Sequence, residues 1–245
     1  MIDNKINILL TRPKEESIRL SKKLDTKLFN SFISPLIQIK KKSYEFNTNE
    51  RYDFLIFTSK NGVLNFQKII DYKKIFVVGE GTYLCAKRNY MKNVINVKGD
   101  ANDLKKKIKP FLNRNAKILH PTSFENNDEF RLFFDRNDCD YRQVHCYHSK
   151  KFNSYPSIFK KFFTSKKEGI VTIFSKRTAA CFISEISKMN FLAEIREKKI
   201  LVLSKSIKKE LNLSGFDKVF ISEKPNEQSM LKLIESITVN TIKND

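Results

Sequence analysis

The chain has 245 residues, of which 40% are apolar and 12% aromatic, so it can bury the core of one large domain or of two small ones. It has no apolar run near the roughly 20 residues of a membrane helix and no basic start typical of a secretory signal, so we expect a cytoplasmic protein without a membrane partner. The net charge of +20 comes from lysines scattered along polar helical faces, a pattern that does not require a nucleic-acid partner.

The first elements are a strand at Ile6–Leu10 and a helix whose apolar residues between 18 and 24 recur at helical spacing. Thr11 and Pro13 stand where a helix favours a capping residue and an early proline. Residues 32–42, FISPLIQIKKK, are then extended and end in charge.

Two stretches far apart in the chain share one pattern, FLIFTSKNGVLNF at 54–66 and VTIFSKRTAACF at 171–182. In each, an apolar run typical of a buried parallel strand ends in a serine and a lysine, and a helical pattern follows. The apolar helical face is expected at Val63, Phe66 and Ile70 in the first copy and at Ala179, Phe182 and Ile186 in the second.

The likeness continues downstream of each copy. The next strand of the first copy is followed by Gly79 and Thr82, and that of the second copy by Ser204 and Ser206. Each copy then has one more short strand and a closing helix. One insertion in the first helix of the second copy accounts for most of the difference in spacing, so we interpret the pair as a structural duplication. Alternating strands and helices predict parallel sheets that are covered on both faces.

The residues between the copies indicate a strand at Lys117–His120, a helix at Phe124–Phe134 and a strand at Tyr141–Tyr147. This unit completes the first copy, whereas the second copy can find its equivalent only in the N-terminal residues 6–28. We therefore predict two similar α/β lobes with two crossings and a cleft beside them. Lobe 1 comprises 1–36 and 150–245, lobe 2 comprises 40–144, and the linkers lie at about 35–41 and 143–151.

Ligands of open parallel sheets bind at the carboxyl ends of the strands, where helix N-termini present free N–H groups. Each hydroxyl there is either a helix cap, worth about 1 kcal/mol to its helix, or a ligand contact. Repetition in both lobes favours ligand contact for some of them. The polar residues at the predicted strand ends are Thr11 and Arg12, Thr58 and Ser59, Gly79–Thr82, Ser175–Arg177, and Ser204–Ser206.

The sequence lacks the short motifs of several common chemistries. It has no GxGxxG, P-loop or GxSxG pattern, and its four cysteines include no CxxC pair and no clustered histidine partner, so we predict no metal site. His145 and Tyr147 alternate along a predicted strand and are expected to share a face. Tyr147 is then either a proton donor that faces the cleft or a packed aromatic.

Seven stretches in order resemble the uroporphyrinogen-III synthases, and they are spread over nearly the whole chain: ILLTRP, PLIQI, DFLIFTSKNGV, VVGEGT, VHCYHSK, VTIFSKRTAACF and LSGFDKVFISEKPNEQSMLKLI. The resemblance implies an α/β fold with two Rossmann-like or flavodoxin-like lobes, the first made from both ends of the chain. It also implies a two-stranded linker with the active site between the lobes. We expect a monomeric enzyme, a lyase that needs no cofactor.

The resemblance implies a substrate, hydroxymethylbilane, which is a linear tetrapyrrole with eight carboxylates. Loss of its hydroxyl as water gives an azafulvene, and ring D attacks through its substituted carbon to form a spiro intermediate. Fragmentation and reclosure then invert that ring to give uroporphyrinogen III. By the same resemblance, Tyr147 assists departure of the hydroxyl and Thr82 lines the cleft. The expected carboxylate-binding positions are Arg12, Ser59, Gly79, Ser175 and Ser206.

The chain departs from this family at a few positions. Ser204 and Lys205 stand where many relatives have a glycine followed by a proline, and small or proline residues are common where Lys60 and Lys176 stand. We predict that the latter two lysines add contacts to substrate carboxylates. Two other classes stay open on the residues alone. One is a two-lobed protein that binds an anionic ligand without catalysis, and the other is a basic nucleic-acid module, whose affinity would fall steeply with salt.

Overall fold

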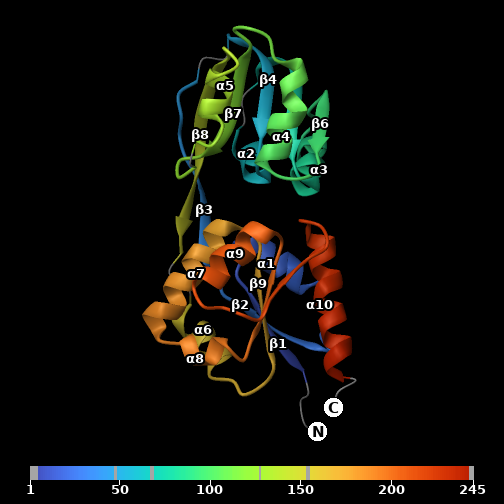
Figure 1. Cartoon of the computed structure of the whole chain (residues 1–245), viewed down its shortest axis with the longest axis vertical. Coiled ribbons are helices and arrows are strands. Elements are labelled where there is room, and N and C mark those ends of the chain that lie inside the picture. The colour runs from blue at the N-terminus through green and yellow to red at the C-terminus, as the bar shows by residue number, and fades with distance from the viewer. Residues whose placement is uncertain (1–4, 47–48, 67–68, 127, 153–154, 243–245) are drawn as a thin grey trace. The chain divides into compact units, whose positions relative to one another are not determined.

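The computed structural model describes residues 5–46, 49–66, 69–126, 128–152 and 155–242, and it divides the chain into two compact units. Unit 1 consists of Met1–Gln38 with Lys151–Asp245, and unit 2 of Ile39–Lys150. The chain therefore passes from unit 1 to unit 2 and back again. Figure 1 labels the elements of each unit.

The sheet of unit 1 has the strand order β11-β10-β9-β1-β2, and each neighbouring pair is parallel. The two strands β1 and β9 lie in the middle and are buried along their whole length, because helices cover both faces of the sheet. The bounds are Ile6–Leu10 for β1, Phe29–Ile33 for β2, Gly169–Ile173 for β9, Lys199–Val202 for β10 and Val219–Ile221 for β11.

Helices α7 and α10 lie on opposite sides of this sheet (Figure 1). Leu20 of α1 and Met230 of α10 pack against Ile8 and Ile170 on one side. Phenylalanine rings fill much of the other, where the Phe163 centroid lies 5.2 Å from that of Phe191. The helices of unit 1 are α1 (Lys14–Ser21), α6 (Pro156–Phe163), α7 (Lys176–Met189), α8 (Leu192–Ile195), α9 (Lys205–Leu213) and α10 (Glu227–Ile242).

The sheet of unit 2 has the order β3-β8-β7-β4-β5-β6. The pairs from β8 to β6 are parallel. At the β3 edge the direction reverses, since Lys42 N donates to Cys146 O (3.1 Å) and Phe152 N donates to Leu36 O (2.9 Å). The bounds are Ile37–Lys41 for β3, Arg51–Phe57 for β4, Asp71–Val78 for β5, Val94–Val97 for β6, Lys117–Ser123 for β7 and Asp140–Lys151 for β8.

The helices of unit 2 also cover both faces of their sheet. Val63 of α2 and Ala86 of α3 belong to one apolar cluster, and Leu104 of α4 and Phe134 of α5 belong to another. The bounds are Lys60–Asn65 for α2, Glu80–Arg88 for α3, Ala101–Ile108 for α4 and Arg131–Asp135 for α5, with a 3-10 turn η1 at Lys109–Phe111.

The two sheets repeat one topology. The order β6-β5-β4-β7-β8 in unit 2 corresponds strand by strand to β11-β10-β9-β1-β2 in unit 1. The N-terminal strand β1 therefore fills in unit 1 the place that β7 fills in unit 2. The predicted fold class, two similar α/β units built on parallel sheets, is confirmed.

Two predicted helices in unit 2 are shorter in the structure. The helix that follows β4 ends at Asn65, because Phe66 leaves the helical conformation and packs its ring 5.9 Å from Tyr44 and 5.6 Å from Phe46. The predicted helix Phe124–Phe134 is wrong over its first half, and only α5 forms.

The cause of the second error is Glu125, which lies in the missing half of that helix. Its carboxylate accepts hydrogen bonds from Ser149 N (2.7 Å) and His148 Nδ1 (2.9 Å), and both donors belong to β8. Phe124 N donates to Tyr147 O of the same strand (2.9 Å). These hydrogen bonds hold the segment against β8, and its backbone does not form a helix.

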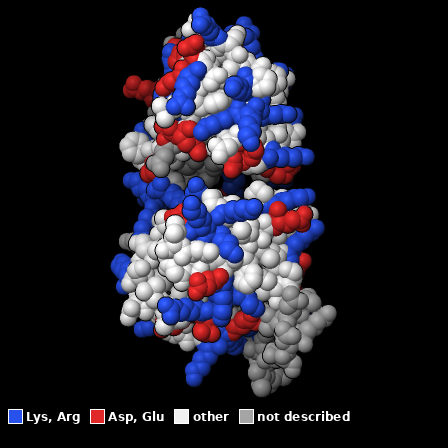
Figure 2. Space-filling view, in the orientation of Figure 1, with Lys and Arg blue, Asp and Glu red and all other residues white. Residues whose placement is uncertain are grey.

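Basic side chains lie all over the face shown in Figure 2, on each unit, and acidic side chains are mixed among them. This is the distribution expected for solvated helical faces.

Candidate functional site

Polar residues follow the central strands of each sheet and begin the next helix. Ser59 follows β4 and is the N-cap of α2, and Ser175 follows β9 and is the N-cap of α7. Ser204 and Gly79 take the corresponding places before α9 and α3. Because the carboxyl ends of parallel strands share one edge of a sheet, each unit gathers its own set of predicted residues at that edge.

The serines at these positions cap their helices through the side-chain oxygen. Ser59 Oγ accepts from Asn61 N, and Ser175 Oγ accepts from Thr178 N, each at 3.1 Å. Ser206 is not a cap, but its Oγ lies 3.0 Å from that of the capping Ser204. A capping serine uses a lone pair and keeps its own proton, so the capping role does not prevent donation to a carboxylate.

The two lysines differ in exposure. Lys176 lies on the surface, whereas Lys60 is half-buried. Burial raises the pKa of the Cys85 thiol, and the nearby Lys60 charge opposes that shift. The positive charge of Lys60, at the start of α2, therefore acts on a partly buried group of unit 2.

Tyr147 lies in β8 and is 6% exposed. Thr122 pairs with His145 and Ser123 pairs with Tyr147, so Cys146 is an extra residue in a β-bulge. The prediction that His145 and Tyr147 share a face of the strand is wrong, because the bulge interrupts the alternation of side chains between them. Both Cys146 and Tyr147 face the apolar cluster beneath α2 and α3, whereas His145 Nδ1 lies 2.9 Å from Ser123 O.

Burial raises the pKa of the Tyr147 phenol, while hydrogen bonding with the hydroxyls of Ser59 and Ser123 opposes that shift. The phenol therefore stays protonated at neutral pH and lies beside a predicted strand-end serine. Ser123 ends β7 and is missing from the predicted site. The sequence gives no comparable signal for it, because His120, Pro121 and Thr122 separate it from the apolar run of this strand.

Gly79 and Thr82 belong to the start of α3. Gly79 has φ +83° and ψ 151°, a conformation that essentially only glycine adopts, and its N–H donates to Val97 O (3.1 Å). Thr82 stands in the first turn of the helix and is 6% exposed. Thr82 is therefore buried in unit 2, at the same edge of the sheet as Ser59.

Arg12 follows β1 and already binds carboxylates of its own chain. It forms ion pairs with Glu16 and with Glu227 Oε2, the latter at 2.6 Å from Nη1, and its guanidinium lies 4.3 Å from the centre of the Phe174 ring. Burial alone would raise the pKa of Glu227, but Lys23, Arg19 and Arg12 lower it to about 2. Sequence reasoning missed both partners. Glu227 is distant in the chain, whereas the spacing of four residues between Arg12 and Glu16 was a signal that could have revealed that pair.

Thr11 is not the cap of α1 that the sequence suggested. Its Oγ1 donates to Thr172 O of the neighbouring strand β9 at 2.6 Å, and Pro13 is the N-cap residue instead. Thr11 is fully buried, and its hydroxyl links β1 to β9 by a hydrogen bond.

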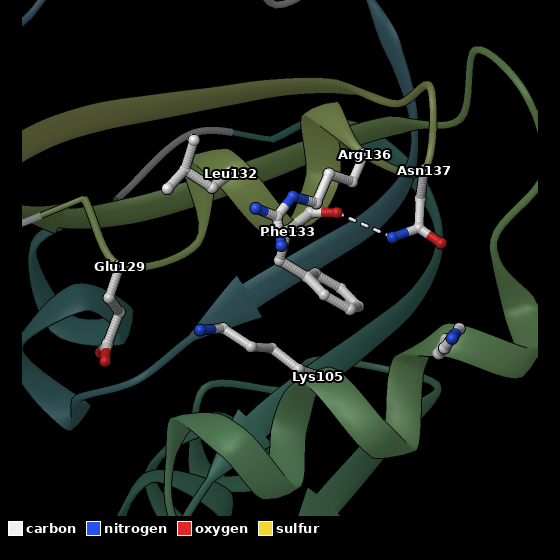
Figure 3. A pocket seen from close by; sticks show the side chains of 7 residues that line it. Lys105, Glu129, Leu132, Phe133, Arg136 and Asn137 are labelled. Atoms are coloured by element: carbon white, nitrogen blue, oxygen red, sulfur yellow. Dashed lines mark hydrogen bonds between the residues drawn. The ribbon is translucent and has the colours of Figure 1, made fainter.

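The surface of the described residues has two hollows, one away from these strand ends and one that begins at Lys205, next to the capping Ser204. One, of about 500 Å³, lies between α4 and α5, and Figure 3 shows Lys105, Glu129 and Phe133 among the side chains that line it. The other, of about 520 Å³, lies along α9 and is lined by Lys205, Lys208 and Lys209 among others. Neither hollow contains a predicted site residue.

The described part of the chain contains no group of three or more His, Cys, Asp or Glu side chains that could hold a metal ion. Within the same residues, none of the helices combines the length and the apolar character that a membrane crossing would need.

A family model described as "Uroporphyrinogen-III synthase HemD" matches residues 18–232, which is most of the chain. The chain belongs to the uroporphyrinogen-III synthase family. It is therefore an enzyme of haem and related tetrapyrrole biosynthesis, with a small-molecule tetrapyrrole as its substrate. The matched range includes every predicted site residue except Arg12.

Two solved structures support the fold of this uroporphyrinogen-III synthase family member. Uroporphyrinogen-III synthetase from Helicobacter pylori has a TM-score of 0.64 at 15% identity, over 95% of this chain and 99% of that chain. A mutant uroporphyrinogen III synthase from the extremely thermophilic bacterium Thermus thermophilus has a TM-score of 0.56 at 13% identity, over 96% and 99%. No curated protein matches the chain in sequence.

Proposed function

We propose that the enzyme is a lyase that cyclises hydroxymethylbilane to uroporphyrinogen III with loss of water. The observation that carries this proposal is the family match across residues 18–232. The polar strand ends of both units fit a substrate with eight carboxylates, because they offer hydroxyls, helix N–H groups and lysines. A net charge of +20 also favours encounter with such a polyanion.

The reaction conserves electrons and moves protons. The C–O bond of the hydroxymethyl group breaks, and the hydroxyl takes one proton and leaves as water. The substituted carbon of ring D bonds to the resulting methylene, the bond between ring D and its bridge breaks, and reclosure at the ring's other carbon releases one proton. Side chains that donate a proton and hold the chain coiled are sufficient for these steps.

Tyr147 is the proposed donor to the departing hydroxyl. Its phenol is protonated at neutral pH, since burial raises its pKa, and the bulge at Cys146 places it beside Ser59 and Ser123. Bulges are common next to active sites because they re-aim a side chain.

The carboxylates of the substrate are proposed to bind at the strand ends. Hydroxyls of capping serines, main-chain N–H groups at helix starts and lysine side chains are suitable partners. Arg12 already pairs with Glu16 and Glu227, so a substrate carboxylate would share its guanidinium with them. The proposed binding residues are Arg12, Ser59, Lys60, Gly79, Thr82, Ser175, Lys176 and Ser206.

The deciding experiment supplies hydroxymethylbilane to the purified protein, oxidises the products and separates the isomers. The type III isomer should dominate, and heat-denatured protein should give the spontaneous type I isomer. Type I alone from the native protein would contradict the proposal. A cytoplasmic location and a monomeric state stay predictions, and size-exclusion chromatography with light scattering tests the second.

A further inference from the structure

A short segment after β7 binds the strand β8 at the residue proposed as the proton donor. Phe124 N donates to the main-chain oxygen of Tyr147 (2.9 Å). The carboxylate of Glu125 makes two more contacts, with Oε1 2.9 Å from His148 Nδ1 and Oε2 2.7 Å from Ser149 N. Two adjacent residues thus make hydrogen bonds to three consecutive residues of β8, and the first of these is Tyr147.

The contacts of Glu125 are strong for their kind. An ionised carboxylate only accepts, so His148 donates from Nδ1 and Ser149 donates from its main-chain nitrogen. Hydrogen bonds to a charged acceptor are about twice as strong as those between neutral groups. The side chains of Glu125 and His148 are 21% and 22% exposed, so water competes little for either group.

The segment itself is held in one shape. Asn126 N donates to Ser123 O (3.1 Å), which closes a turn directly after β7, and His145 Nδ1 lies 2.9 Å from the same oxygen. The ring of Phe124 packs against the imidazoles of His145 and His148, at 5.7 and 5.2 Å between centroids. The turn therefore presents its carboxylate to β8 from a fixed position.

The main chain at Tyr147 depends on this segment because Tyr147 directly follows the bulge. Cys146 is an extra residue that interrupts the ladder between β7 and β8 just before Tyr147. Tyr147 pairs with Ser123, which is the last residue of β7. Beyond that pair, Phe124 and Glu125 take the place of a neighbouring strand on this side of β8.

We propose that Glu125 is a positioning residue that fixes the direction of the Tyr147 phenol by holding β8 directly after the bulge. The role of Tyr147 in this proposal rests on the proposed function. Loss of the carboxylate would release the main chain at Ser149 and the side chain of His148, and the phenol would lose the direction that the bulge gives it. A misplaced donor slows its step, because proton transfer depends on hydrogen-bond geometry. A carboxylate that only stabilises the fold would leave the phenol unchanged.

The first test follows the phenol in the absence of substrate. The chain has eight tyrosines, so labelling tyrosine with ¹³C at Cζ gives few resonances, and Tyr147→Phe identifies the one that belongs to Tyr147. Glu125→Met should move this resonance, whereas Glu125→Gln should leave it close to its wild-type position. Glu129→Ala, which removes an exposed acid of the same unit, should also leave it unchanged.

Methionine and glutamine form a matched pair at this position. Both are close to glutamate in size and carry no charge, but only glutamine has an oxygen that accepts from Ser149 N. A difference between the two variants therefore reports the hydrogen bond and not the loss of charge. An unmoved Tyr147 resonance in Glu125→Met, or equal shifts in Glu125→Met and Glu125→Gln, would overturn the proposal. Glu125→Ala takes the place of Glu125→Met if that variant does not fold.

The second test is kinetic. Glu125→Met should lower kcat for hydroxymethylbilane about 3- to 10-fold with little change in KM, because the residue acts on the donor and not on substrate binding. Glu125→Gln should keep most of the wild-type kcat. In the Tyr147→Phe background, Glu125→Met should lower kcat by less than about 2-fold, because a positioning residue has no effect once the group that it positions is removed.

A wild-type kcat in Glu125→Met, or the full loss again in the Tyr147→Phe background, would overturn the positioning role. A wild-type protein that forms only the type I isomer would instead contradict the proposed function. The NMR comparison decides whether Glu125 fixes the phenol whatever the activity, so the two failures are distinguishable.

Discussion

Replacing Glu227 with glutamine tests the ion-pair cluster that holds Arg12. Glu227 Oε2 lies 2.6 Å from Arg12 Nη1 and 3.1 Å from Arg19 Nη2, and Oε1 lies 2.7 Å from Lys23 Nζ. Burial opposes ionisation of this carboxyl, but the three cations together lower its pKa from 4.5 to about 2. Glutamine keeps the size of the side chain and removes the charge.

The expected loss follows from the pKa. A fall from 4.5 to about 2 corresponds to about 3 kcal/mol of folding free energy, at about 1.4 kcal/mol for each pH unit. The side chains of Arg19 and Lys23 are 53% and 48% exposed, so solvent screening reduces this to about 2 kcal/mol. Because the folded pKa is the lower one, the stabilisation is complete above about pH 5 and is lost as the pH falls toward 2.

Urea unfolding followed by circular dichroism measures the effect. Glu227→Gln should lower the free energy of unfolding by about 2 kcal/mol at pH 7, and the difference from wild type should shrink to less than half at pH 3. Glu223→Gln, an exposed acid nearby, is the matched control and should change little. A difference that is below about 0.5 kcal/mol at pH 7, or that does not shrink at pH 3, would refute the reasoning.

Gly79→Ala should destabilise the protein by about 1–3 kcal/mol, because φ is +83° there, whereas Gly81→Ala in the same helix should stabilise it by about 0.5–1 kcal/mol. Equal urea midpoints for the two variants would contradict this. Lys60→Glu and Lys176→Glu should each raise KM for hydroxymethylbilane with the circular dichroism spectrum unchanged, and unaltered kinetics would remove the lysines from the site. Tyr147→Phe should lower kcat about 10-fold or more, and a wild-type kcat would show that the phenol serves packing alone.

Much of the fold could be predicted because burial leaves a strong mark on local sequence. The apolar runs before Ser59 and Ser175 are fully buried strands in the structure. That the N-terminal strand belongs to the unit of the second copy followed from counting which strand and helix that copy lacked, and β1 pairs with β9 there. These inferences need only apolar periodicity and the rule that parallel strands lie in covered sheets.

The errors arose where a contact between distant residues decides the local conformation. Residues near Phe124 have helical spacing, but the carboxylate of Glu125 binds β8 and prevents the helix. The bulge at Cys146 depends on the register between β7 and β8, which alternation within one strand cannot reveal. The ion pair of Arg12 with Glu227 was not foreseen either, because nothing near Arg12 in the sequence indicates that Glu227 lies against it.

The candidate site was likewise predictable where local sequence decides the structure and not where contacts between distant residues do. Hydroxyls at strand ends are visible in the sequence because each follows an apolar run, and Ser59, Ser175 and Ser204 all begin helices as expected. Whether such a hydroxyl donates or accepts depends on partners elsewhere in the chain; Thr58 Oγ1, for example, lies 3.2 Å from Nε2 of His120, 62 residues away. The positions of these groups can therefore be read from local sequence, whereas their chemistry depends on hydrogen-bond partners that only the fold brings together.

Ser175 allows the helix cap and the ligand contact to be separated. Its Oγ accepts from Thr178 N, so Ser175→Ala removes the cap and should cost about 1 kcal/mol, whereas Ser175→Asp keeps a capping oxygen and should preserve stability. The aspartate also puts a negative charge where a substrate carboxylate is proposed to bind. At about 4 Å, two like charges repel by about 1 kcal/mol in water and about 4 kcal/mol near a protein surface.

The two variants should therefore move different quantities. Ser175→Asp should raise KM for hydroxymethylbilane at least about 5-fold at wild-type stability, and Ser175→Ala should lower the urea midpoint with a smaller change in KM. Because aspartate caps as well as serine, a rise in KM without a loss of stability cannot come from loss of the cap. A wild-type KM in Ser175→Asp would mean that Ser175 caps α7 and does not contact the substrate.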